Sequence, residues 1–105
     1  MSVQLKPEWT ADSILAFLTD HRDTLKAMGV NQIGLFGSYI RGEQLPDSDI
    51  DFLFTMDDFS WRRWMNIWNF LEDQLGCLVD LVPKEDLRPE LQRYVLPEVP
   101  YARGY

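Results

Sequence analysis

Cysteine and long apolar runs are both scarce in this sequence, and each scarcity narrows the possibilities. The one cysteine, Cys77, excludes an internal disulfide, which suits a reducing cytoplasm. No stretch approaches the roughly 20 apolar residues of a membrane-spanning helix. The N-terminal residues MSVQLKPEWTADS also lack the charged-then-apolar pattern of a secretory signal. The sequence therefore predicts a cytoplasmic protein with no membrane attachment.

Basic charge is also scarce. Ten Lys and Arg residues stand against seventeen Asp and Glu residues, which gives a formal net charge of -7. Proteins that bind nucleic acid neutralise phosphates with clustered basic side chains. The charge balance disfavours direct binding of nucleic acid and favours a protein or a small molecule as the substrate.

The length and the hydrophobic content predict one domain over residues 1–105. A chain of 105 residues with 46% hydrophobic content is large enough for one core but too small for a separate substrate domain. No internal repeat or low-complexity linker divides it. Anything beyond core catalysis is then expected from a partner.

Hydrophobic periodicity and turn residues predict alternating helices and strands. Thr10 is placed to begin the first helix, and Gly29 and Gly76 are placed to end the two longer helices. In chain order the predicted elements are a helix over 11–28, strands over 31–38 and 48–56, a helix from about 60 to 75, a strand over 77–83 and a helix over 89–96.

The most informative segment is LFGSYIRGEQLPDSDIDFLF, which reads as strand, glycine turn, short helix, turn and strand. Gly37 lets the backbone approach a ligand closely, and Ser38 is placed to cap a helix whose first N–H groups attract phosphate. Asp49 and Asp51 share one face of a strand because alternate side chains point the same way. Two such carboxylates repel each other unless a cation lies between them, and magnesium is the hard ion expected beside phosphate.

Simpler readings of the acidic cluster remain possible. As an isolated pattern it is commonly an exposed strand-entry turn, but the upstream Gly-Ser pair and Asp80 within an apolar strand favour a site. A calcium loop is excluded because Phe52 replaces the required glycine and no glutamate closes the loop. A Walker loop is excluded because GLFGSYIRGE lacks the Gly-Lys-Ser/Thr ending.

Four short stretches, taken together, resemble a known family: Gly37-Ser38, Arg41-Gly42-Glu43, Ser48-Asp49-Ile50-Asp51, and GCLVDLV with Asp80. They resemble the minimal nucleotidyltransferase (MNT) domains of the DNA polymerase beta-like superfamily, over most of the chain. The resemblance implies an α/β fold with a small mixed three-stranded sheet flanked by helices.

The resemblance also implies roles for individual residues. Gly37 and Ser38 would contact the triphosphate, and Asp49 and Asp51 would hold metal ions. Asp80 would be the third metal ligand, and the three aspartates together would be the catalytic residues.

Arg41 and Ile40 lie close to the Gly-Ser pair in the sequence. Arg41 is a secondary candidate for binding phosphate, and a salt bridge to Glu43 or Asp47 is a comparable role for it. Ile40 departs from the small residue that the family usually carries at this place.

The short form of this family resembles the antitoxin of HEPN/MNT toxin–antitoxin pairs. That resemblance implies a Mg²⁺-dependent enzyme that transfers AMP from ATP to a tyrosine of a HEPN-domain toxin, in a hetero-oligomer with that toxin. Two alternatives stay open: an antitoxin that acts by binding alone, and a nucleotidyltransferase acting on a small molecule.

The second long helix is rich in aromatic residues. Trp61, Trp64 and Trp68 with the adjacent arginines are typical of an interface centre, although packing in the core explains them nearly as well. The proline-bounded tail with Tyr101 and Tyr105 is the other segment expected to dock on a partner.

Overall fold

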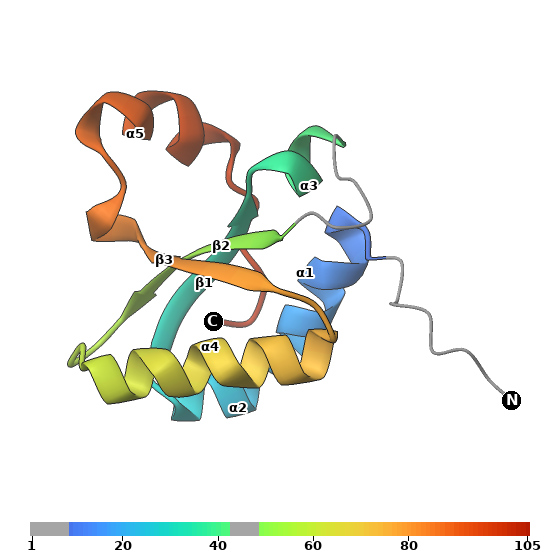
Figure 1. Cartoon of the computed structure of the whole chain (residues 1–105), viewed down its shortest axis with the longest axis vertical. Coiled ribbons are helices and arrows are strands. Elements are labelled where there is room, and N and C mark those ends of the chain that lie inside the picture. The colour runs from blue at the N-terminus through green and yellow to red at the C-terminus, as the bar shows by residue number, and fades with distance from the viewer. Residues whose placement is uncertain (1–8, 43–48) are drawn as a thin grey trace, which may run out of the picture.

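The computed structural model describes residues 9–42 and 49–105, with the side chains of Ser38 and Arg41 left aside. Figure 1 shows its helices and strands in chain order. They are α1 (Ala11–Asp20), α2 (Arg22–Ala27), β1 (Val30–Phe36), α3 (Ser38–Arg41), β2 (Ile50–Met56), α4 (Trp61–Leu75), β3 (Val79–Pro83), the 3₁₀ helix η1 (Lys84–Asp86), α5 (Pro89–Val95) and the 3₁₀ helix η2 (Leu96–Glu98).

The three strands form one sheet in the order β1-β2-β3. β1 is antiparallel to β2, and β2 is parallel to β3, with α4 as the crossover between them. The C-terminal segment adds a short bridge on the free edge of β1, where Gly34 pairs with Tyr101. The predicted small mixed three-stranded sheet flanked by helices is confirmed.

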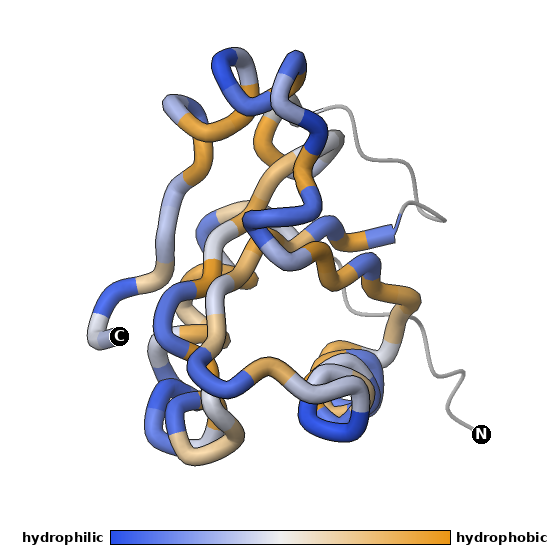
Figure 2. The backbone as a smooth tube through the Cα atoms, turned by 90° about the vertical axis from the view of Figure 1, so that its left-hand side faces the viewer, coloured by the Kyte–Doolittle hydropathy of each residue, from blue (hydrophilic) through white to orange (hydrophobic). Residues whose placement is uncertain are grey.

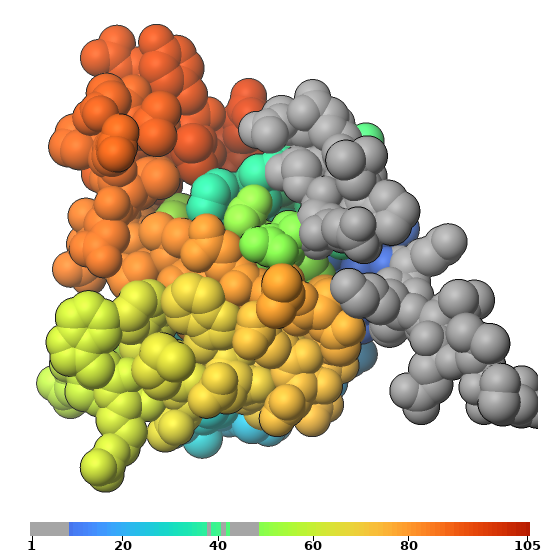
Figure 3. Space-filling view, viewed as in Figure 1, coloured from blue at the N-terminus to red at the C-terminus, as the bar shows by residue number. Residues whose placement is uncertain are grey.

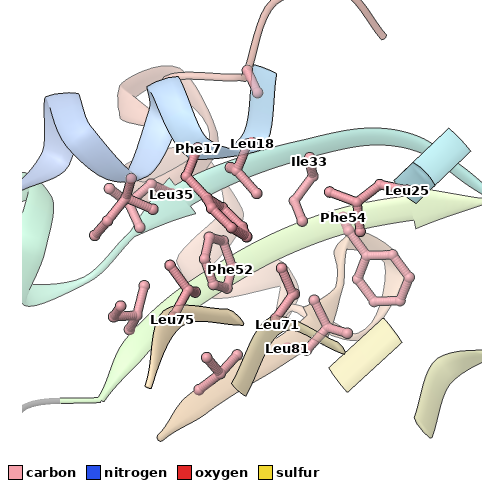
Figure 4. Packing of buried hydrophobic residues seen from close by; sticks show 14 of the residues in the cluster. Phe17, Leu18, Leu25, Ile33, Leu35, Phe52, Phe54, Leu71, Leu75 and Leu81 are labelled. Carbon is pink, nitrogen blue, oxygen red and sulfur yellow. The ribbon is translucent and has the colours of Figure 1, made fainter. Parts of the chain in front are cut away.

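One face of the sheet carries the main hydrophobic core. Figure 4 shows side chains of α1, α2 and α4 meeting side chains of all three strands in this core. The labelled residues include Phe17 and Leu18 of α1, Leu71 and Leu75 of α4, Leu35 of β1, Phe52 and Phe54 of β2, and Leu81 of β3. Phe52 is fully buried, and burial of such a side chain stabilises the fold by about 1.5–3 kcal/mol.

The opposite face carries a smaller core. Leu53 of β2 packs there with Leu87 and Val99, against partly buried side chains from α5 and η2. Because side chains alternate along a strand, Asp51 lies on the same face as Leu53. Figure 1 shows α4 and α5 on opposite sides of the sheet, and Figure 2 shows hydrophobic segments, in orange, alternating with hydrophilic ones, in blue, along the backbone.

The predicted helix over 11–28 is wrong in one respect, because the structure divides it at His21. The backbone of His21 has φ -104° and ψ 16°, which breaks the α-helical run. The Arg22 Nη1 donates to the Thr19 carbonyl oxygen at 2.9 Å, and His21 Nδ1 lies 2.9 Å from the Phe17 carbonyl oxygen. Polar side chains here compete with the backbone for helix carbonyls, a local effect that hydrophobic spacing does not reveal.

The predicted start and end of α4 are confirmed. The Ser60 hydroxyl accepts from the Arg63 N–H at 3.1 Å, and Gly76 closes the helix in the left-handed conformation with φ 70°. α4 also protects the outer edge of β3. The Trp64 Nε1 donates to the Leu81 carbonyl oxygen at 3.1 Å, and the Glu72 carboxylate accepts from the Val79 N–H at 3.0 Å. These two bonds occupy backbone groups of β3 that another strand would need for pairing.

The C-terminal tail packs on its own chain. The Tyr105 hydroxyl donates to the Leu18 carbonyl oxygen at 2.7 Å, and burial raises the pKa of Tyr105 well above its usual value. Tyr101 packs with the smaller core. Both tyrosines therefore have contacts within the chain, and the docking expected of the tail stays a prediction. Within residues 9–42 and 49–105, no helix has the length and apolar character needed to cross a membrane.

Candidate active site

Gly37 forms the turn between β1 and α3, and its backbone adopts φ +79°, a conformation that favours glycine. Phe36, the residue before it, pairs with Asp51 in the register of β1 and β2. A Cβ added to Gly37 would overlap Asp51 Oδ2 and would lie 3.1 Å from Asp51 Cγ. The absence of a side chain at Gly37 therefore makes room for the Asp51 carboxylate, which joins the glycine turn to the acidic strand.

The sheet brings the third predicted carboxylate next to this pair. Asp51 on β2 is the register partner of Asp80 on β3, and neighbouring strands lie about 4.8 Å apart. Side chains at paired positions of parallel strands lie on the same face, so Asp80 lies beside Asp51. Asp49 directly precedes β2, which the structure begins at Ile50, so the prediction that both aspartates lie within the strand is wrong by one residue. Asp49 and Asp80 are exposed, and Asp51 is half-buried.

The donor chemistry of these aspartates suits a hard divalent cation, because carboxylate oxygens are the ligands that Mg²⁺ prefers. The three side chains do not converge on one point, however. Among the described residues, no group of three or more His, Cys, Asp and Glu side chains is arranged to hold a metal ion. The set of Asp49, Asp51 and Asp80 as metal ligands therefore stays a prediction.

A pocket of about 300 Å³ opens beside Gly37. Phe36, Gly37 and Ile40 line one side of it, and Tyr94, Val95 and Glu98 of α5 and η2 line the other. In the space-filling view of Figure 3, α5 and the residues around Gly37 lie on neighbouring parts of one face. Ile40 is half-buried against the main core and also lines this pocket, so its bulk is accommodated in the fold.

Tyr39 is a neighbour of the site that sequence analysis did not single out. It is 8% exposed, on the short helix that follows Gly37. Burial raises the pKa of Tyr39, and the nearby Cys77 and Asp49 add to this effect. The phenol is therefore neutral at physiological pH and contributes no charge beside Asp49.

Two predicted phosphate-binding residues are located only by their backbones. Ser38 and Arg41 begin and end α3, but their side chains lie outside the described part of the structure, as do Glu43 and Asp47. The roles proposed for the Ser38 hydroxyl and for the Arg41 guanidinium stay predictions.

The remaining residues of the site could not be found from the sequence. Tyr94, Val95 and Glu98 line the pocket beside Gly37, although more than fifty positions separate them from it. Asp80 also lines a second pocket, with Trp64, Trp68 and Asp86. No local pattern marks Tyr94, Val95, Glu98 or Asp86, because tertiary packing alone brings them to these pockets.

Comparison with known proteins identifies the family of this chain. The model of the nucleotidyltransferase domain family matches residues 18–102, and the chain belongs to that family. It is 40% identical over 94 residues to the protein adenylyltransferase MntA of Thermococcus cleftensis, an alignment that covers 88% of this chain and 95% of the relative.

Solved structures show the same fold. One, provisionally assigned as a minimal nucleotidyltransferase, superimposes with a TM-score of 0.75 and 28% identity, over 89% of this chain and 96% of that chain. A second belongs to a toxin–antitoxin crystal structure with AMP-PNP. It superimposes with a TM-score of 0.66 and 26% identity, over 92% of this chain and 75% of that chain.

Proposed function

We propose that this chain is an MntA-type antitoxin, a protein adenylyltransferase that moves AMP from ATP onto a HEPN-domain toxin and so neutralises it. The observation that carries the proposal is the contact between the glycine turn and the acidic strand, where the Asp51 carboxylate occupies the space that a side chain on Gly37 would need. The glycine turn, which would bind phosphate, therefore lies next to Asp51, and the register of β2 and β3 sets Asp80 beside Asp51.

The nucleotide would bind at the pocket beside Gly37, with its phosphates over Gly37 and Ser38. The pocket volume of about 300 Å³ lies at the lower end of the range for small-molecule sites. Phe36, Ile40 and Val95 supply apolar surface there, which suits a nucleobase better than a phosphate. ATP as the co-substrate agrees with the relative solved with AMP-PNP.

Asp49 and Asp51 would hold Mg²⁺, with Asp80 as a further ligand. A bound magnesium ion neutralises phosphate charge and favours the departure of pyrophosphate. Asp51 is the ligand with the most fixed position, because Gly37 and the pairing with Phe36 hold it from β1.

The transfer of AMP needs only ATP and the acceptor hydroxyl group as reactants. The acceptor hydroxyl oxygen forms a bond to the α-phosphorus of ATP, the bond from that phosphorus to the β-bridging oxygen breaks, and pyrophosphate leaves. The hydroxyl proton passes to a carboxylate oxygen of Asp80, which lies beside Asp51 on the next strand. Positioning and electrostatics supply most of the rate acceleration.

The acceptor would be a tyrosine hydroxyl of the toxin, within a hetero-oligomer of the two proteins in the cytoplasm. The T. cleftensis relative is named a protein adenylyltransferase, and the structural relative was crystallised as part of a toxin–antitoxin pair, so both agree with a protein substrate.

The test is transfer of radiolabelled AMP from α-labelled ATP to the toxin, with and without EDTA. We expect the toxin to become labelled and to lose its RNase activity, and EDTA to prevent both. A toxin that is neutralised without incorporating label would overturn the enzyme and would identify an antitoxin that acts by binding alone. Label on a small molecule but never on the toxin would identify the other alternative.

A further inference from the structure

We propose that the second pocket, beside Asp80, is the acceptor site and binds the phenol ring of the residue that receives AMP. The inference rests on the proposed adenylyltransferase function and adds the place where the acceptor is held. The pocket has a volume of about 230 Å³ and is lined by Trp64 and Trp68 of α4, residues 80–83 of β3, and Asp86 of η1.

Two indole rings give this pocket an aromatic wall. The ring centroids of Trp64 and Trp68 lie 5.5 Å apart with their planes inclined at 58°. Trp64 is fixed in place because its Nε1 donates to the Leu81 carbonyl oxygen at 3.1 Å. Aromatic rings at such separations favour tilted or offset arrangements, so a planar ring of a ligand gains both contact area and favourable geometry here.

The charge of the pocket selects against phosphate. Asp80 and Asp86 line it, and none of the described residues that line it is a Lys or an Arg. Two carboxylates repel an anionic group and accept a hydrogen bond from a hydroxyl group. A neutral phenol carries no negative charge and has a hydroxyl group that can donate to these carboxylates. The triphosphate of ATP is anionic and has no such donor.

The position of Asp80 links this pocket to the chemistry. Asp80 is the register partner of Asp51, which contacts Gly37, and it also lines the aromatic pocket. A phenol held against Trp64 and Trp68 would therefore present its hydroxyl to the carboxylate that receives its proton. The nucleotide would approach from the Gly37 side of the sheet and the acceptor from the outer edge of β3, where the pocket is lined by residues from both faces of that strand.

The first experiment measures binding without catalysis. In the ¹⁵N-labelled protein, the four tryptophan indole N–H signals are followed while N-acetyl-L-tyrosinamide is added up to its solubility limit. We expect the signals of Trp64 and Trp68 to shift and those of Trp9 and Trp61 to stay. N-acetyl-L-phenylalaninamide, which lacks the hydroxyl group, should bind more weakly. Shifts of Trp64 and Trp68 with AMP but not with the tyrosine probe, or with neither, overturn the proposal.

The second experiment measures transfer to the toxin. Trp68→Leu should raise KM for the toxin about tenfold and leave KM for ATP unchanged, because it removes an aromatic contact on the acceptor side. Trp61→Ala is the matched control, since Trp61 lies on the same helix, is 70% exposed and does not line the pocket. Asp86→Ala provides a second variant that tests the pocket from an exposed position, in case Trp68→Leu disturbs the core.

The outcomes separate the two proposals. Wild-type transfer to the toxin with unchanged KM in both Trp68→Leu and Asp86→Ala refutes the acceptor site and leaves the adenylyltransferase standing. Binding of the tyrosine probe at Trp64 and Trp68 without any AMP transfer by the wild-type protein refutes the adenylyltransferase and leaves the phenol pocket standing.

Discussion

Replacing Gly37 by alanine tests the contact on which the proposed active site depends. The new Cβ would overlap Asp51 Oδ2 and lie 3.1 Å from Asp51 Cγ, so the carboxylate has to move. We estimate that displacement to be on the order of 1 Å, and a displacement of that size in a catalytic group costs about 100-fold in rate. Alanine at φ +79° also strains the backbone by about 1–2 kcal/mol.

Gly42 provides the control that separates these two effects. Its φ of +67° imposes a similar strain on alanine, but a Cβ there meets nothing within 4 Å among the residues that the structure describes. Gly37→Ala and Gly42→Ala should therefore lose similar amounts of unfolding free energy, about 1–2 kcal/mol each, as measured by urea denaturation. Only Gly37→Ala should lose AMP transfer, by about 100-fold at saturating ATP and toxin.

Two results would refute this reasoning. If Gly37→Ala transfers AMP at the wild-type rate, the placement of Asp51 against Gly37 has no catalytic importance. If Gly42→Ala loses as much activity as Gly37→Ala, backbone strain explains the loss and the contact with Asp51 does not.

The remaining predictions concern the carboxylates and the C-terminal tail. Asp49→Asn and Asp51→Asn should each abolish AMP transfer, with thermal stability equal to or above the wild-type value because a like-charge repulsion is removed; an active variant of either kind removes that residue from the site. Asp80→Asn should lose turnover but keep much of the affinity for ATP·Mg measured by calorimetry, and wild-type turnover would exclude Asp80 from the chemistry. Tyr105→Phe should cost about 0.5–1.5 kcal/mol by removing the hydrogen bond to Leu18. Because the pKa of Tyr105 is raised in the folded chain, wild-type stability should fall as pH rises above about 10, where the unfolded tyrosine ionises, and Tyr105→Phe should flatten this fall; identical pH profiles would contradict it.

Local rules were enough to predict the order of the elements and part of the site. The alternation of β2 sets Asp51 on one face and Ile50 and Phe52 on the other, whatever the rest of the chain does. The ends of α4 at Ser60 and Gly76 likewise follow from capping, which involves only near neighbours in the sequence. Local rules failed at His21, where side chains compete for the carbonyls of the same helix.

The pairing of Asp51 with Asp80 is a tertiary result. The sequence supplies two acidic residues on separate strands, but their distance depends on the register of β2 against β3. That register is set where Phe52 and Leu81 enter the same core, since a shift by one residue would turn the apolar face outward.

The sequence by itself determined the chemical groups of this protein: a glycine turn, an aspartate in a strand with another directly before that strand, and a third aspartate in an apolar strand. Each depends on backbone geometry over a few residues, and such geometry is local. Only the tertiary structure decided that Asp51 fits into the space at Gly37, that α5 closes a pocket beside this turn, and that Trp64 and Trp68 border Asp80. These arrangements arise from burying apolar side chains of distant segments together, which no short stretch of sequence specifies.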